Sequence, residues 1–299
     1  MRCGLKTNDF REITVSDIEV IKAYSEKYRF ESCDFNAVNL FSWGHFINLK
    51  TALFRDRLLF YNFESGFMIY PFGVPFDRKE LLCLSDMMLS EGMSGNFISV
   101  PEEYLTYHPE ISENFQSVFD RDNSDYLYST EKLAKLTGKK LHKKKNLVSQ
   151  FMREYPGHKI EPFRGKYIGM CIEHSEKWCI EQSEICPDDK RLELNVMKRA
   201  VSHHELLGLE GLIVFLGNNP VAFSFFSRQN CDTVDVHFEK YDSKFKGSAQ
   251  LINLETAKLM LPRYKFINRE QDMGKEGLRQ SKMTYDPLRL IPTYKLIRK

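Results

Sequence analysis

Residues 232–260, DTVDVHFEKYDSKFKGSAQLINLETAKLM, decide how the rest of the chain is interpreted. Polar and apolar residues alternate through the first part of this stretch, which predicts a strand with two distinct faces. One face carries Val234, Val236 and Phe238, and the other carries Asp235, His237 and Glu239. From Leu251 to Leu261 apolar residues recur at helical spacing instead. The stretch therefore predicts a strand, a short cationic loop and a helix.

The loop between this strand and helix is the predicted phosphate site. Its candidate residues are Lys244, Lys246, Gly247 and Ser248. The first N–H groups of a helix have no backbone partners, and the helix dipole favours an anion beside them. Gly247 has no Cβ, so a phosphate could approach the backbone closely. The alternative is an ordinary turn with solvated lysines.

Composition indicates a globular chain with no strong overall charge. The 299 residues are 42% hydrophobic and 28% charged, with a formal net charge of +2. Affinity for a polyanion would therefore have to come from local clusters. The N-terminus has no apolar signal-peptide core, no apolar run reaches the length of a membrane span, and the seven cysteines are scattered. These features predict a cytoplasmic protein with reduced thiols and no integral membrane segment.

The predicted elements indicate an α+β protein with two domains. The second half reads as two helices, a hairpin at 212–226, the strand and helix of the opening stretch, a strand at 265–268, a helix at 275–283 and a strand at 290–297. The first half contains a similar hairpin at 58–70. Because Pro156-Gly157 breaks the chain between them, we expect domains at 1–157 and 158–299, each a mixed sheet flanked by helices.

A dense basic segment precedes this boundary. Residues 139–146, KKLHKKKN, carry five lysines and one histidine. The candidate ligand-binding residues in it are Lys143, Lys144, Lys145 and Asn146. Such a segment concentrates positive potential on a nearly neutral chain, which suits tRNA, another polyanion or an anionic lipid headgroup. The alternative is a solvated helix start.

Two segments carry a resemblance to a known family. They are YSTEKLAKLTGKKLHKKKNLVSQF at 128–151 and INREQDMGKEGLRQSKMTYDP at 267–287. Both resemble a bacterial family of unassigned proteins related to the C-terminal catalytic domain of phosphatidylglycerol lysyltransferase. The resemblance implies two tandem GNAT-like domains, as in the Fem-type peptidyltransferases. It also implies transfer of an aminoacyl group from a charged tRNA to an amine or a hydroxyl.

A second resemblance indicates an alternative acyl donor. Lys244-x-x-Gly247-x-Ala249 is similar to the pyrophosphate loop of acetyltransferases that use coenzyme A. It implies that a coenzyme A thioester is an alternative to aminoacyl-tRNA as the donor. No other cofactor is indicated.

The second of these segments also contains a mixed-charge cluster. Its candidate substrate-binding residues are Asn268, Glu270, Asp272, Arg279 and Lys282. Polar groups just past a strand end suit ligand binding at the mouth of an α/β sheet. The alternative is a structural corner held by ion pairs.

Acyl transfer needs a base for the acceptor's proton and donors for the developing oxyanion. The candidate bases are Glu239 and His237, and Tyr285 is a candidate proton donor. No metal is expected, because the spacing of Cys171, His174, Cys179 and Cys186 matches no zinc module. The favoured prediction is an acyl- or aminoacyltransferase. An acetyl-CoA-dependent N-acetyltransferase and a non-catalytic module that binds RNA or an anionic surface are the alternatives.

Overall fold

The computed structural model describes residues 4–182 and 188–299, and within them the chain forms two compact units. Unit 1 contains the chain up to Asp125 together with Gln271–Lys275 and Ile291–Lys299. Unit 2 contains Tyr126–Glu270 and Glu276–Leu290. The boundary expected at residue 157 lies inside unit 2, where it separates α6 (His142–Glu154) from β8 (His158–Pro162).

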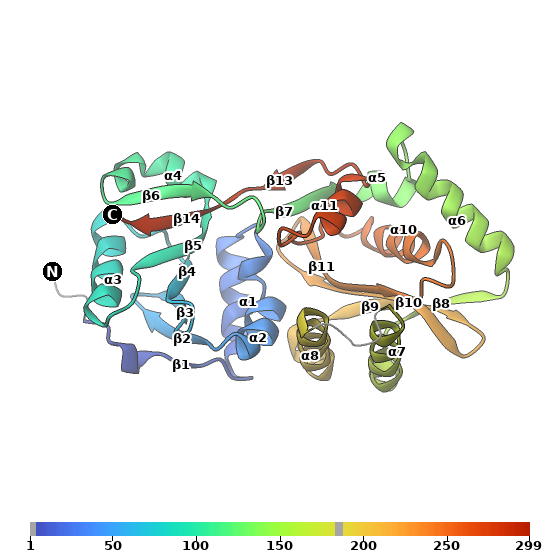
Figure 1. The fold of residues 1–299 in the computed structure, drawn as a ribbon, viewed down its shortest axis with the longest axis horizontal. Helices are drawn as coiled ribbons and strands as arrows, with labels where there is room; N and C mark the ends of the chain where they lie inside the picture. Colours follow the sequence, from blue (N-terminus) through green and yellow to red (C-terminus); the bar gives the residue numbers. More distant parts are fainter. Residues whose placement is uncertain (1–3, 183–187) are drawn as a thin grey trace. The chain divides into compact units, whose positions relative to one another are not determined.

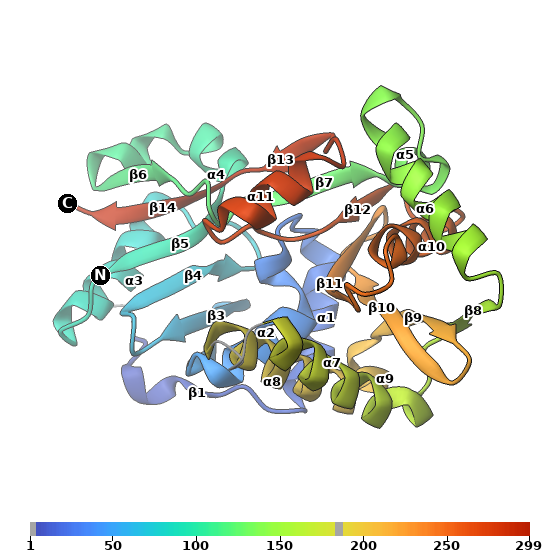
Figure 2. The ribbon, with the colours of Figure 1, turned by 45° about the vertical axis from the view of Figure 1, so that its right-hand side comes forward.

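Unit 1 is a seven-stranded mixed sheet with helices (Figures 1 and 2). Its strands are β1 (Arg11–Glu12), β2 (Leu49–Phe54), β3 (Arg57–Asn62), β4 (Phe67–Phe72), β5 (Asn96–Pro101), β6 (Phe115–Phe119) and β14 (Thr293–Arg298). Its helices are α1 (Asp17–Tyr28), α2 (Ala37–Phe46), α3 (Arg78–Ser90) and α4 (Glu102–Tyr107). The order in the sheet is β1-β2-β3-β4-β5-β14-β6, and only β4 and β5 pair in parallel.

Unit 2 also has a seven-stranded mixed sheet. Its strands are β7 (Asp125–Ser129), β8 (His158–Pro162), β9 (Glu210–Leu216), β10 (Asn219–Arg228), β11 (Thr233–Tyr241), β12 (Phe266–Asn268) and β13 (Arg289–Ile291). Its helices are α5 (Thr130–Lys135), α6 (His142–Glu154), α7 (Ile168–Gln182), α8 (Asp188–Ser202), α9 (His204–Leu207), α10 (Ser248–Met260) and α11 (Glu276–Met283). The sheet order is β13-β7-β12-β11-β10-β9-β8, with the parallel pair at β11 and β12.

The two sheets share one strand plan. In each, four strands in chain order pair antiparallel, and the fourth then pairs in parallel with the fifth. The sixth position is filled from the other half of the chain: β14 stands beside β5, and β7 beside β12. The expected tandem mixed sheets are therefore confirmed. The terminal strand, however, completes the first sheet and not the second.

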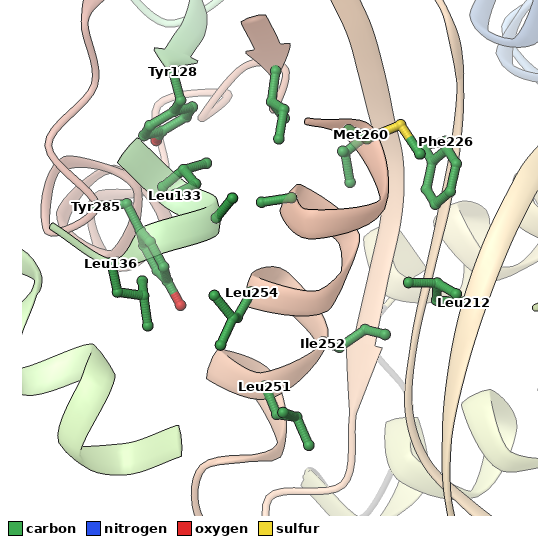
Figure 3. Packing of buried hydrophobic residues seen from close by; sticks show 14 of the residues in the cluster. Tyr128, Leu133, Leu136, Leu212, Phe226, Leu251, Ile252, Leu254, Met260 and Tyr285 are labelled. Atoms are coloured by element: carbon green, nitrogen blue, oxygen red, sulfur yellow. The ribbon is translucent and has the colours of Figure 1, made fainter. Parts of the chain in front are cut away.

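Helix α10 organises the core of unit 2. It lies on one face of the sheet, with α7 and α8 on the other (Figure 1). Leu251, Ile252 and Ala257 of α10 are almost completely buried, as the helical spacing predicts. Figure 3 shows Phe226 and Leu212 of the sheet on one side of α10, and Tyr285 and Leu136 on the other. A substitution in α10 is therefore expected to disturb the packing of the sheet and also that of Leu136, after α5, and Tyr285, after α11.

Among the described residues, no helix combines the length and the apolar character needed to cross a membrane. Cys179 is disulfide-bonded, so the expectation of uniformly reduced thiols is wrong at that position. Of the four residues weighed as a zinc set, Cys186 lies outside the described residues. Cys171 is buried, as expected for a small apolar thiol, and burial raises the pKa of its thiol to about 12.

Candidate functional site

A β-bulge in β11 divides the polar residues that alternation placed on one face. Phe225 pairs with Phe238 while Phe226 pairs with Val236, so His237 is an extra residue on β11. An extra residue reverses the alternation beyond it. Glu239 therefore lies opposite Ser224, on the face that α10 covers. The expected common face of His237 and Glu239 is wrong.

On the α10 face, Glu239 forms part of a charged cluster. Arg269 follows β12, and its Nη2 is 3.0 Å from Glu239 Oε1. Asn253 of α10 donates from Nδ2 to Glu239 Oε2 at 3.4 Å. The guanidinium carbon of Arg269 also lies 4.7 Å from the ring centre of Tyr285 and 5.7 Å from that of Tyr128. The guanidinium is thus held by one carboxylate and two aromatic rings, and the Arg269 side chain is only 14% exposed.

The second terminal nitrogen of Arg269 makes this cluster a candidate binding site. Nη1 is buried, and no group in the described part of the chain accepts a hydrogen bond from it. Buried donors on a charged group are usually paired, and an unsatisfied one calls for an explanation. A carbonyl, carboxylate or phosphate oxygen of a ligand would supply the acceptor.

Lys144 connects the basic segment to this cluster. Its Nζ lies 4.3 Å from the ring centre of Tyr285. Burial, and then the charge of Arg269, lower the pKa of Lys144. Burial raises the pKa of Tyr285 to about 12, so its phenol is protonated at neutral pH. Two cationic side chains and a neutral phenol therefore gather beside Glu239, an arrangement able to hold an oxyanion.

The bulge gives His237 different neighbours. Its Nε2 is 2.8 Å from Ser227 Oγ, and its Nδ1 is 2.9 Å from Glu270 Oε1. Asp235 Oδ2 lies 3.8 Å from the same Nδ1. Ligand-type atoms of Asp235, His237 and Glu270 all fall within 4.8 Å of one another, so among the described residues this set could hold a metal ion. The same contacts also suit proton transfer through the imidazole.

The predicted phosphate loop is closed on one side by α6. Gly247 has a φ of +95° and precedes the first turn of α10. A Cβ at this position would stand 2.4 Å from the carbonyl oxygen of Leu147 and 3.0 Å from Phe151 Cβ. Ser248 is buried and its N–H donates to Phe245, whereas Lys244 and Lys246 are exposed. The glycine thus lets α6 approach the start of α10. The space beside Gly247 that a phosphate was expected to enter is occupied by Leu147 and Phe151 of α6.

The other basic residues lie along α6. Lys143, Lys145 and Asn146 are exposed in the first two turns. Lys143 and Asn146 line a shallow depression of about 490 Å³ that extends to Arg153. Lys140, just before α6, is ion-paired with Asp286 at 2.6 Å. The outer face of α6 is therefore positive and open, while Lys144 points to the cluster.

The mixed-charge motif is divided between several environments. Asn268 is buried and its Oδ1 accepts the N–H of Glu270 at 2.8 Å. Lys282 of α11 is buried, and its Nζ donates to the carbonyl oxygen of Arg269. Asp272 belongs to unit 1, where it is fully buried and 3.0 Å from Arg121 Nη1. Arg279 is half-buried on α11.

Sequence reasoning missed two residues of these clusters. Arg269 stood inside the quoted motif, but adjacent charged residues give no sign of which side chain turns inward. Ser227 is an ordinary strand residue in the sequence, and only the cross-strand register of β10 and β11 places it beside His237.

Comparison with known proteins places this architecture among GNAT-like transferases. The family described as phosphatidylglycerol lysyltransferase, C-terminal, matches residues 26–297. The chain belongs to that family. An uncharacterised protein of Mycoplasmoides gallisepticum is 23% identical over 189 residues, which are 59% of this chain but only 57% of that protein.

Solved structures agree with this assignment. A conserved protein of unknown function from Bacteroides thetaiotaomicron is 30% identical, with a TM-score of 0.90 over 97% of this chain and 99% of that one. L-PGS of Bacillus licheniformis is 13% identical, with a TM-score of 0.63 over 94% and 91% of the two chains. FemX is 10% identical, with a TM-score of 0.57 over 96% and 97%. The last two likenesses concern the fold.

Proposed function

We propose that this protein is an aminoacyltransferase that takes an aminoacyl group from a charged tRNA and passes it to an amine or hydroxyl acceptor. Family membership supports acyl transfer as the class of reaction. The observation that carries the proposal is the buried Nη1 of Arg269, a cationic donor with no acceptor among the described residues. The carbonyl oxygen of an aminoacyl ester becomes negative during transfer, and such a donor would stabilise it.

The basic face of α6 supports tRNA as the donor. Lys143 and Lys145 are exposed on the same helix that brings Lys144 to Tyr285. Phosphate contacts on α6 could therefore guide the acylated end of an RNA toward Arg269. Binding of this kind releases counterions, so the affinity would fall steeply as salt is added.

The proton-transfer groups follow from the contacts already described. Glu239 is ion-paired with Arg269 at 3.0 Å, which favours its role in holding the guanidinium. His237 contacts a hydroxyl and a carboxylate on the opposite face of the sheet from Arg269, and it is the second candidate base. Tyr285 keeps its phenolic proton at neutral pH and is the candidate proton donor.

Coenzyme A remains the competing donor, with Lys244, Lys246, Gly247 and Ser248 as its phosphate site. The contact between Gly247 and Leu147 argues against it, since the open approach to the backbone that a pyrophosphate needs is occupied on that side. Lys244 and Lys246 are exposed and would still attract a phosphate.

Binding measurements separate the two donors. The affinity of the full chain for a pool of aminoacyl-tRNAs, for deacylated tRNA and for coenzyme A is measured at several salt concentrations. Charge reversal at Lys143 and Lys145 is expected to weaken tRNA binding about tenfold or more and to flatten its salt dependence. The matched control reverses Lys79 and Lys159, which are also exposed.

Transfer is then followed with radiolabelled aminoacyl groups and a panel of amines and lipids. Arg269→Gln should lower transfer about 10²-fold while leaving tRNA affinity nearly unchanged. Equal tRNA affinity in the charge-reversed variant and its control would contradict the tRNA proposal. Thermal stabilisation by coenzyme A alone would favour the acetyl-CoA alternative.

A further inference from the structure

Ser227, His237 and Glu270 form a continuous hydrogen-bonded chain inside unit 2. Ser227 lies near the end of β10, His237 on the bulge of β11, and Glu270 just after β12. The two heavy-atom distances, 2.8 Å from Oγ to Nε2 and 2.9 Å from Nδ1 to Oε1, are both within hydrogen-bond range. The imidazole side chain is completely buried.

Two backbone irregularities bring this chain together. The bulge adds His237 to β11, and without it the strand register would carry the imidazole elsewhere. Glu270 has a φ of +57°, a left-handed conformation that costs a non-glycine residue about 1 kcal/mol or more. Asn268 Oδ1 holds this turn by accepting the N–H of Glu270. Strained positions of this kind gather at functional sites.

With an ionised Glu270 and a neutral imidazole, the direction of each hydrogen bond is determined. An ionised carboxylate only accepts, so Nδ1 of His237 donates to Glu270. A neutral imidazole then has Nε2 as its acceptor, and Ser227 Oγ–H donates to it. A hydroxyl that donates to an imidazole, which is in turn oriented by a carboxylate, is the arrangement that activates a serine for attack.

We propose that Ser227 is an acyl-accepting nucleophile, with His237 as its base and Glu270 as the positioning residue. Ser227 Oγ bonds to the acyl carbon of an activated ester or thioester while the bond from that carbon to the leaving oxygen or sulfur breaks. The proton of Ser227 passes to His237 Nε2 and then to the leaving atom. The acceptor amine or hydroxyl next attacks the acyl-serine, its proton passes to Nε2, and Oγ leaves and recovers that proton.

This inference rests on the proposed function only for the identity of the acyl donor. The activation of Ser227 by His237 and Glu270 does not depend on which donor is used. Ser227 is only 3% exposed. Exclusion of water from an acyl-serine would favour transfer to an acceptor over hydrolysis. The competing interpretation is that Asp235, His237 and Glu270 hold a divalent metal ion. The geometry favours the hydrogen-bonded chain, because both imidazole nitrogens of His237 already lie at hydrogen-bond distance from Ser227 and Glu270.

Labelling with diisopropyl fluorophosphate tests the nucleophile without any donor. Intact mass and peptide mapping of the full chain should show one adduct, on Ser227, and Ser227→Ala should abolish it. Ser224→Ala is the matched control, because Ser224 is equally buried on β10 but pairs with Glu239 on the other face. His237→Gln should slow labelling by about 10²–10⁴-fold. Circular dichroism and thermal unfolding establish that each variant is folded.

Glu270→Gln separates positioning from structure. It keeps a side chain of the same size but removes the charge that stabilises the imidazolium. The labelling rate should fall, and the midpoint of its pH profile should move to lower pH, which a purely structural role would not produce.

Three results would overturn the proposal: a folded wild type with no adduct, an adduct on another residue, or a tightly retained divalent metal that His237→Gln releases. The last would assign the cluster to a metal centre. Labelling of Ser227 together with failure to bind or use aminoacyl-tRNA would leave this inference standing and remove the proposed donor.

Discussion

The glycine at position 247 combines a left-handed φ with a close helix contact. Its φ is +95°, and the carbonyl oxygen of Leu147 occupies the space next to its missing Cβ. Each feature alone would favour glycine, and together they exclude other residues. The absence of a side chain at Gly247 lets α6 pack on the start of α10. Helix α6 carries the basic face, and α10 organises the core.

Gly247→Ala is therefore expected to destabilise the protein by about 2–4 kcal/mol, the sum of a strained φ and overpacking. Urea unfolding at equilibrium measures the change. Gly157→Ala is the control, since nothing lies within 4 Å of a Cβ there, and it should stay within about 0.5–1 kcal/mol of wild type. A Gly247→Ala protein as stable as that control would show that α6 does not constrain the loop.

At the scale of single residues, the sequence identified candidate polar residues but not how they are arranged. Glu239, His237 and Tyr285 were recognisable as polar residues on a strand and in a charged motif. The bulge was not, because it arises from the register between Phe225–Phe226 and Val236–Phe238, and alternation within β11 cannot reveal it. For the same reason Glu239 was expected beside His237 and is found beside Arg269.

Helix α6 shows how one element can bring two kinds of contact together. Its outer face exposes Lys143 and Lys145, while Lys144 is drawn toward Tyr285 and Arg269. Burial of a lysine ammonium beside a guanidinium opposes the charged form, so the folded state carries a penalty at neutral pH. A helix selected for stability alone would not be expected to keep a lysine there.

Lys144→Met should remove this penalty while keeping the apolar stem. The pKa of Lys144 is lowered in the folded state from the usual 10.5, so the unfolded chain binds its proton more tightly. The stability of wild type relative to Lys144→Met should therefore rise as the pH increases from neutral toward 10.5. Urea unfolding of both proteins across that range measures the difference, with Lys143→Met as the exposed control. A constant difference would contradict the lowered pKa.

Element prediction succeeded where the pattern is local. The strand at 234–239 and the helix at 251–261 appear as β11 and α10, and the hairpin at 212–226 appears as β9 and β10. Membership of a sheet is a long-range property. β7 pairs with β12, and β14 pairs with β5 and β6, although the boundary expected at residue 157 places each of these strands in the other half of the chain.

The exchange of strands links the two halves of the whole molecule. The first sheet requires β14 from the end of the chain, and the second requires β7 from its first half. If the chain were cut at residue 157, the first fragment would keep β7, which belongs to the second sheet, and would lack β14. The second fragment would keep β14 and would lack β7. Folding of unit 1 therefore depends on β14, which lies about two hundred positions along the chain from its partner β5. Contacts between such distant residues slow folding.

Deletion of residues 293–299 tests this dependence, because β14 lies between β5 and β6 and pairs with both. Its loss would leave two unpaired strand edges and uncover the core beneath Leu296, which is fully buried. Hydrogen exchange should accelerate in 96–101 and 115–119, while β9 and β10 of unit 2 keep their protection. Removal of Lys299 alone, which leaves β14 complete, is the control. Unchanged protection of β5 and β6 in the deletion would mean that the first sheet is complete without its exchanged strand, and the two halves would then be separable domains.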